Sequence, residues 1–549
     1  EDAAFHYALA DAFTVCDAYH ASVLADTASN RIYLWSGTAD PSGRLGRKDN
    51  GPGTEERPQT NGYTWTTYPE RLEKAGISWR VYQGGTGEPG SPTDNYTDNS
   101  LEFFARYQVK EGADPTGSLV RNGVSNHTLR DLRDDVVHDR LPQVTWIVAP
   151  YKYSEHPKSS PADGAFYIRS VIEALTANPK VWKRTVLFLN YDENDGFFDH
   201  VVPPAPPLES GADGEGVVSE GLVEGLRDEI LDLDRHPRLS SPVVPGSDPL
   251  GEQIVGLGNR VPMIVISPWT RGGWVCSETF DHTSVLRFLE KRFGVEEPNI
   301  STWRRAVCGD LTSAFDFAGK TDVGMPKIGL PFGSEGKAPI AVPRNQVMPE
   351  QEPGTRPARA LAYAWSLQHR IDGGASRIVF DNAGKLGAAF LVYDGLHREV
   401  PPRRYAVMAG DRIEDHWPLA KTGDGYDRRI HGPNGYFCAL RGFADDVLEA
   451  EVRGVAGQRR VEVVITHRGS KPMACRIANA YGDGDVQELV VPAGGSSSIT
   501  IDLAASAGWY DIAITTPEAP RYLRRFAGHH EDGKPATSDP GPRASPAVA

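Results

Sequence analysis

An acid-rich segment, NYDENDGFFDHV at residues 190–201, holds the residue types best suited to chemistry in this chain. It overlaps the end of the apolar run TVLFLNY, which is typical of a buried strand. Ligands of open parallel sheets bind at the carboxyl ends of the strands, where Asp192 and Glu193 are expected. Adjacent carboxylates are hard oxygen ligands that suit a divalent cation. The alternative is a solvated acidic turn, but the density of acids, together with His200, favours a metal site.

Two further histidines, His156 and His282, lie beside other predicted elements and are candidates for a role in catalysis. His156 lies in a loop after the apolar run QVTWIVA, where a general acid could stand, although a lone loop histidine is more often a surface residue. His282 lies at the start of the helical pattern HTSVLRFLEKRFG, where Asp281 could equally be a helix cap without any role in catalysis.

A hydroxyl nucleophile is available in the segment SVLADTASNRIYLWSGT, residues 22–38, where Thr27 and Ser29 lie in a predicted turn before an apolar run. A metal that lowers the pKa of such a hydroxyl makes it a nucleophile. On residue type alone, Thr27 and Ser29 are better interpreted as turn residues without a catalytic role. Aromatic residues nearby could form a cage for a quaternary ammonium group or, as is more usual, pack in the core; they are Tyr33, Trp35, Tyr63 and Trp65.

The elements that must position these residues belong to an α/β domain spanning residues 1–318. Apolar runs rich in β-branched and aromatic residues predict buried strands, and helical patterns lie between them. This alternation indicates βαβ units, so we expect a central, mostly parallel sheet with flanking helices. The predicted strands are residues 76–83, 143–149, 185–191 and 260–266, and a long insertion follows at 200–258.

The second half of the chain has the short alternating segments of all-β domains. A segment at 425–442 resembles one at 508–528, which favours two tandem small sandwiches over one large domain. We therefore expect a linker at 319–358, β-sandwich domains at 359–455 and 456–535, and a disordered tail at 536–549.

Composition narrows the function further. A formal net charge of −15 without a basic block argues against nucleic-acid binding and against simple electrostatic docking on anionic membranes. No apolar run is long enough to predict a transmembrane segment. None of the five cysteines lies in a C-x-x-C pair, so a thiolate zinc site is not expected; Cys276 and Cys308 are candidates for a disulfide, and buried free thiols are the equal alternative.

The ordered motifs of the chain resemble the bacterial phosphocholine-preferring phospholipase C family, which is related to acid phosphatases of the alkaline-phosphatase-like superfamily. The β-rich tail is similar to the paired C-terminal domains of those enzymes. The motifs are HYALADAFTVCDAYHASVL, NRIYLW, SEHP, YDENDGFFDHV with the following VPPAPP, and DHTSVLRFLEKRFG.

The resemblance implies a Ser or Thr nucleophile shortly before an Asn-Arg pair, and the matching residue is Thr27. It implies one divalent cation, of unknown identity, bound by adjacent acids that match Asp192 and Glu193 and by the nucleophile itself. A histidine that protonates the leaving group matches His156. The family's other metal ligands, a Glu-Asn pair, would precede Glu1, so we expect the first part of the catalytic domain to lie upstream.

Three further residues fall in recurring motifs of the family and are candidates for phosphate or substrate binding: Asn30, His200 and His282. The expected activity is phospholipase C hydrolysis of choline phospholipids at a membrane or micelle surface, by a protein that is secreted or periplasmic. The oligomeric state is left open. The alternatives are an acid phosphatase acting on monoesters and an inactive fragment that serves as a binding module.

Overall fold

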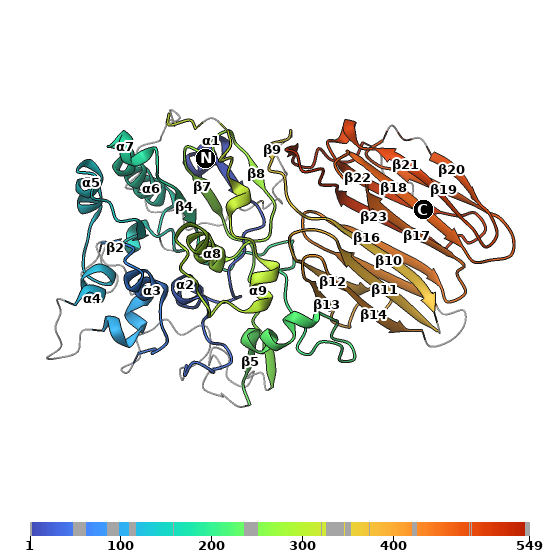
Figure 1. Ribbon diagram of the computed structural model, residues 1–549, viewed down its shortest axis with the longest axis horizontal. Helices are drawn as coiled ribbons and strands as arrows, with labels where there is room; N and C mark the ends of the chain where they lie inside the picture. Colours follow the sequence, from blue (N-terminus) through green and yellow to red (C-terminus); the bar gives the residue numbers. More distant parts are fainter. Residues whose placement is uncertain are drawn as a thin grey trace.

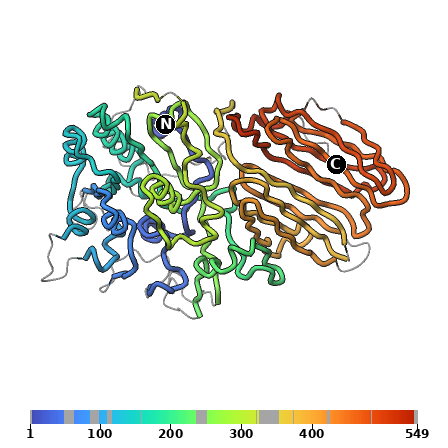
Figure 2. The backbone as a smooth tube through the Cα atoms, viewed as in Figure 1, coloured from blue at the N-terminus to red at the C-terminus, as the bar shows by residue number. Residues whose placement is uncertain are grey.

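The protein consists of two lobes that differ in architecture, an α/β lobe and an all-β lobe, placed side by side (Figure 1). Figure 2 shows that the N-terminus lies in the first lobe and the C-terminal part of the chain in the second. The computed structural model describes residues 3–47, 62–84, 98–108, 117–157, 159–234, 251–319, 321–324, 345, 353–372, 374–419, 425–482, 484 and 486–543.

The main sheet of the α/β lobe is mixed, so the expectation of a mostly parallel sheet is wrong. Its strand order is β24-β9-β8-β1-β7-β4. β7 runs antiparallel to both of its neighbours, β1 and β4, whereas β1 and β8 are parallel. The chain connects β4 to β7 through a long insertion at residues 200–258, called the excursion below. A connection of this length allows β7 to run antiparallel to β4. The strands are β1 (Thr14–Cys16), β4 (Leu187–Asn190), β7 (Met263–Ile266), β8 (Val275–Cys276), β9 (Pro357–Ala358) and β24 (Ala536–Thr537).

Two of the predicted strands form a separate parallel pair, β2 (Trp79–Gln83) with β3 (Val144–Val148). All four predicted strands therefore exist, although they do not share one sheet. In the excursion, β5 (Ile230–Asp232) and β6 (Glu252–Ile254) make a short antiparallel pair.

Helices flank these sheets, and their ends follow from capping residues (Figure 1). Asp281 caps α8 by accepting a hydrogen bond from the backbone amide of Thr283, and Gly294 ends the helix in the left-handed conformation. The helices are α1 (Ala4–Ala12), α2 (Thr27–Ser36), α3 (Tyr68–Lys74), α4 (Ser118–Gly123), α5 (Leu129–Val137), α6 (Pro161–Thr176), α7 (Pro179–Trp182), α8 (His282–Phe293) and α9 (Thr302–Val307). Short 3-10 turns are η2 (Ser100–Phe103), η3 (Ala105–Tyr107), η4 (Tyr151–Tyr153), η5 (Glu220–Leu222), η6 (Glu224–Glu229), η8 (Thr312–Ala314) and η9 (Ala504–Ser506). Among the described residues, no helix is long and apolar enough to cross a membrane.

The all-β lobe consists of two similar halves fused through one sheet. In each half a four-stranded sheet faces a three-stranded sheet, and β16 pairs with β23 to join the two larger sheets into eight strands. The first half comprises β10 (Trp365–Asp372), β11 (Ala375–Asn382), β12 (Ala388–Asp394), β13 (Arg403–Val407), β14 (Arg412–Pro418), β15 (Gly425–His431) and β16 (Phe437–Phe443). The second comprises β17 (Leu448–Gly454), β18 (Arg460–His467), β19 (Met473–Asn479), β20 (Val486–Val491), β21 (Ser496–Asp502), β22 (Trp509–Thr515) and β23 (Leu523–His529).

The two halves share a single hydrophobic core. On β18 every second side chain, Val461, Val463 and Ile465, points into this core, as the period of two of a strand requires. The expected domain boundary at residue 455 falls after β17, which pairs within the second half. The expected linker lies mostly outside the described residues. Part of the expected tail is ordered, since β24 pairs with β9 and the Tyr481 hydroxyl donates to Asp539.

All five cysteines are buried free thiols, which is one of the two alternatives that the sequence left open. Cys276 is not bonded to Cys308; it lies on β8 directly beside Cys16 of β1.

Candidate functional site

Thr27 is the first residue of α2, and its half-buried hydroxyl stands at the positive end of that helix. Exposed backbone N–H groups and the helix dipole favour negative charge there, as on a phosphate oxygen or an alkoxide. Asn30 is buried and holds the preceding loop: its carbonyl accepts from the amide of Val23, and its amide donates to the carbonyls of Val23 and Ala25. In this structure Asn30 therefore shapes the turn that presents Thr27.

Arg31 connects this helix to the acidic segment. It lies one turn after Thr27 on the same face of α2, because residues four apart are neighbours on a helix. Its Nε donates to Asp192 Oδ2 at 2.9 Å, and its Nη1 donates to the Asp98 carbonyl at 2.7 Å. The helix that begins at Thr27 is thus linked to the carboxylate of Asp192 through Arg31. Arg31 was not predicted as a site residue, although its spacing from Thr27 was a readable signal.

Asp192 lies two residues after the end of β4, and several groups determine the charge of its carboxyl. Burial raises the pKa of its carboxyl, but Arg31 and the nearby His282 outweigh burial and lower it below the ordinary value. The adjacent Glu193 carboxylate accepts from the amide of Asp195 at 2.5 Å. The paired acids therefore stand at a strand end as predicted.

His282 is buried at the start of α8 and contacts the backbone of Asp192. Its Nε2 lies 2.7 Å from the Asp192 carbonyl oxygen, and its Nδ1 lies 2.8 Å from the Tyr19 hydroxyl. Burial lowers the pKa of this histidine, which favours the neutral ring. Because each ring nitrogen contacts one of these partners, the imidazole is suited to positioning the Asp192 segment.

His156 is exposed beside the acidic segment. It lies near enough to Asp195 to lower the pKa of that carboxyl, although burial raises this pKa more. The preceding residue, Glu155, accepts from the Tyr191 hydroxyl at 2.8 Å and contacts His6 Nε2 at 3.0 Å. The loop with His156 is thereby attached next to Asp192.

His200 is not brought to this place by any described contact. Its side chain is 88% exposed, and its Nδ1 lies 3.7 Å from Asp199. Asp199 is committed to Arg260, which donates to both carboxylate oxygens at 2.7 and 2.8 Å.

The donors available for a metal ion fit a hard divalent cation in kind, since they are two carboxylates and a hydroxyl. They are few: within the part of the chain that the structure describes, no three His, Cys, Asp or Glu side chains gather in a way that could hold a metal.

A buried ion cluster behind the site was missed by the sequence analysis. Arg304 is fully buried and donates to Glu229 and to Asp281, the N-cap of α8, and also to the Ser22 carbonyl. It therefore ties the loop before Thr27 to the helix that carries His282. No local sequence pattern reveals such a cluster, because its members are far apart in the chain.

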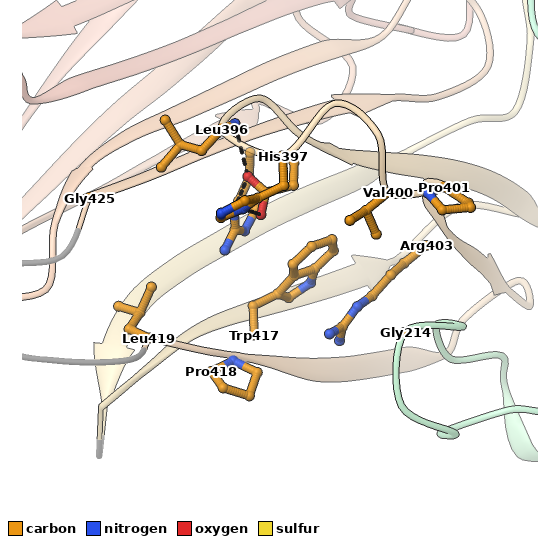
Figure 3. Close-up of a pocket in the computed structure, with 12 residues that line it drawn as sticks. Gly214, Leu396, His397, Val400, Pro401, Arg403, Trp417, Pro418, Leu419 and Gly425 are labelled. Carbon is orange, nitrogen blue, oxygen red and sulfur yellow. Dashed lines mark hydrogen bonds and ion pairs between the residues drawn. The ribbon is translucent and has the colours of Figure 1, made fainter.

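The aromatic residues considered for an ammonium cage are buried in a core of the α/β lobe, and Tyr63 stacks on Trp65 with ring centroids 4.6 Å apart. A pocket of about 570 Å³ lies instead in the all-β lobe (Figure 3). There Trp417 has the guanidinium groups of Arg403 and Arg428 at 4.0 and 4.4 Å from its ring centroid. None of the predicted site residues lines it.

An α/β lobe with a hydroxyl at a helix N-terminus and paired carboxylates at a strand end has the parts of a phosphoester hydrolase. The sequence pattern of the phosphoesterase family matches residues 1–296, and that of the bacterial phospholipase C C-terminal domain matches residues 357–443 and again 447–529. The chain belongs to the phosphoesterase family. The repeated match agrees with the two halves of the all-β lobe and with the repeat seen in the sequence.

Bacterial relatives match nearly the whole chain. It is 45% identical to a non-hemolytic phospholipase C of Pseudomonas aeruginosa, covering 98% of this chain and 77% of the relative. It is 42% identical to a non-hemolytic phospholipase C of Burkholderia pseudomallei, covering 98% and 78%. It is 38% identical to a hemolytic phospholipase C of Pseudomonas aeruginosa, also covering 98% and 78%.

Proposed function

We propose that this protein is a phospholipase C that hydrolyses choline phospholipids, phosphatidylcholine or sphingomyelin, to phosphocholine and diacylglycerol or ceramide. The observation that carries the proposal is the contact of Arg31 with Asp192, which places the Thr27 helix against the acidic segment. The relatives named above support phospholipase C over the monoesterase and binding-module alternatives. An alkaline-phosphatase-like fold and a secreted or periplasmic location belong to the same proposal and rest on the family resemblance.

In the proposed reaction the Thr27 hydroxyl gives up its proton to water, its oxygen attacks phosphorus, and the bond from phosphorus to the lipid oxygen breaks. His156 donates a proton to that departing oxygen. Water then attacks the phosphothreonine; one of its protons goes to the departing Thr27 oxygen and the other to His156, which releases phosphocholine and restores both groups. The N-terminus of α2 stabilises charge on the phosphoryl oxygens, and Arg31 keeps Asp192 beside the reacting group. Asn30 and His282 position these groups, while His200 remains a candidate for substrate contact.

A divalent cation held by Asp192 and Glu193, with Thr27 as a further ligand, would lower the pKa of the hydroxyl and neutralise phosphoryl charge. Metal content by elemental analysis tests this part, with Asp192→Asn as the variant expected to lose the metal. An unchanged content in that variant would remove Asp192 from the ligand set.

Thr27→Ala tests the nucleophile. We expect a loss of at least about a thousandfold in turnover of phosphatidylcholine and of a soluble choline diester, because Thr27 is the proposed nucleophile that forms the phosphoenzyme. Phosphocholine release is the measurement. Ser29→Ala, which removes a hydroxyl from the same helical turn, is the matched control and should retain activity. Activity retained by Thr27→Ala, or a faster wild-type rate on a simple monoester than on the diester, contradicts the proposal.

A further inference from the structure

The loop that begins with the candidate metal ligands presents two unusually exposed aromatic side chains. Phe198 is 103% exposed and Phe197 is 75% exposed, relative to an isolated residue. Apolar side chains of this size are normally removed from water, because each is stabilised by burial. Exposed apolar patches mark interaction sites more often than scattered single residues do.

The exposed loop is firmly attached. The carbonyl of Phe197 accepts from Asn194 Nδ2 at 2.7 Å and from Asn259 Nδ2 at 3.3 Å. Directly after the pair, Asp199 is clamped by Arg260 through both carboxylate oxygens. The backbone is thus held on both sides while the two rings point into solvent.

Two other exposed apolar side chains lie on this loop and on a neighbouring segment. Leu24 lies in the loop before Thr27, and Val202 follows the aromatic pair. Hydrogen bonds from Ala21 to the carbonyl of Asn259 and from Leu257 to the carbonyl of Pro204 place the three segments 21–26, 194–205 and 256–260 side by side. We call Leu24, Phe197, Phe198 and Val202 the apolar rim.

The charges of these three segments decide which partner fits the apolar rim. The basic residues of these three segments are Arg260 and His200, and Arg260 is already paired with Asp199. Asp26 and Asp195 add negative charge. Together with the net charge of −15, this arrangement does not attract an anionic surface. This arrangement suits a zwitterionic lipid surface with an apolar interior.

We propose that the apolar rim inserts into the surface of a zwitterionic phospholipid aggregate and so brings the Thr27 site to its substrate. The inference rests on the proposed function, because the rim adjoins that site and its substrate would be an amphiphile. The aromatic rings enter the interfacial region, where amphipathic and apolar side chains gain free energy without a membrane-spanning segment.

The test uses Phe198→Ser and Phe197→Ser in the full chain, with two substrates. On phosphatidylcholine vesicles each variant should lose about tenfold or more in rate, corresponding to the loss of one buried aromatic side chain. On a soluble choline diester, such as p-nitrophenyl phosphorylcholine, the rate should stay within about twofold. Val490→Ser on β20, which removes another exposed apolar side chain far from the site, is the matched control and should change neither rate.

Co-sedimentation with phosphatidylcholine vesicles in a Thr27→Ala background measures docking without hydrolysis, and Phe198→Ser should lower the bound fraction. Equal loss on both substrates, or a lowered melting temperature, would make the rings structural and overturn the inference. Full activity of Phe198→Ser on vesicles would also overturn the inference. The same holds if Leu396→Ser in the all-β lobe loses vesicle activity instead, or if the wild type is a dimer that Phe198→Ser dissociates. If the wild type cleaves neither substrate but still binds vesicles through Phe198, the proposed function fails while the docking surface stands.

Discussion

Asp192 keeps its negative charge although it is partly withdrawn from water. Burial alone would raise the pKa of its carboxyl, but the Arg31 guanidinium at 2.9 Å and the adjacent His282 hold the pKa below the ordinary value. A carboxylate that is already ionised can bind a cation without first losing a proton. The Arg31 guanidinium therefore prepares Asp192 for the role that its residue type suggested.

His20 lies in the loop before Thr27 and gives a pH dependence of stability. Burial lowers its pKa from 6.5 to about 4, and its Nδ1 lies 2.9 Å from the Gly258 carbonyl oxygen. Between these values the unfolded chain binds the proton more readily than the folded chain. The free energy of unfolding should therefore fall by about 3 kcal/mol through this residue as the pH decreases from 6.5 to 4.

Urea unfolding of the wild type and of His20→Asn between pH 7.5 and pH 4 measures this contribution. The stability advantage of the wild type over the variant should shrink as the pH decreases and level off below about pH 4. Other titrating groups act in both proteins and cancel in the difference. Two curves that run parallel would show that His20 titrates alike in the folded and unfolded chains.

At the level of elements, one arginine holds together parts of the chain that the site needs. Arg304 on α9 reaches Glu229 at the end of η6, Asp281 before α8, and the Ser22 carbonyl. The guanidinium also lies 4.2 Å from the Tyr33 ring centroid on α2. The elements that carry Thr27 and His282 therefore depend on one buried ion cluster for their relative placement.

Arg304→Met should lower the free energy of unfolding by about 3–5 kcal/mol, because it leaves two carboxylates buried without their partner. Arg305→Met is the control on the neighbouring residue, whose guanidinium is partly exposed and pairs with Glu290. A partly exposed pair contributes less than a fully buried cluster, so Arg305→Met should cost less than Arg304→Met. Chemical denaturation measures both, and a similar cost for the two variants would contradict the role given to the cluster.

At the level of the whole molecule, the two lobes pack through a shared apolar cluster. Ala406 of β13 belongs to one apolar cluster with Val218 and Leu222 of the excursion and Trp303 of α9. The amide of Ser219 donates to the Ala406 carbonyl at 2.9 Å, and the amide of Met408 donates to the Ser219 hydroxyl at 2.9 Å. The long excursion thus serves as the contact surface for the all-β lobe.

Gly387→Ala tests this interface. A Cβ at Gly387 would lie inside contact distance of the Ala306 carbonyl oxygen of α9, so the lobes would have to move apart. We expect the melting temperature to fall by several degrees, equivalent to about 1–3 kcal/mol. Gly425→Ala is the control, because its nearest new contact is an ordinary one at 3.5 Å. Scanning calorimetry distinguishes the variants, and equal melting temperatures would show that the interface adapts freely.

Thr27 was assigned as the nucleophile by the family resemblance of its motif. The sequence by itself determined the type of each half, the existence of the strands that carry the site, the repeat, and Asp192 and Glu193 as candidates. These depend on local pattern: apolar runs, turn residues and adjacent acids are read from neighbouring positions. Only the tertiary structure decided that β7 runs antiparallel, that the two halves of the all-β lobe share one core, and that Arg31 of α2 contacts Asp192. These depend on pairings between residues far apart in the chain, which local pattern does not specify because many such pairings are compatible with the same strands and helices.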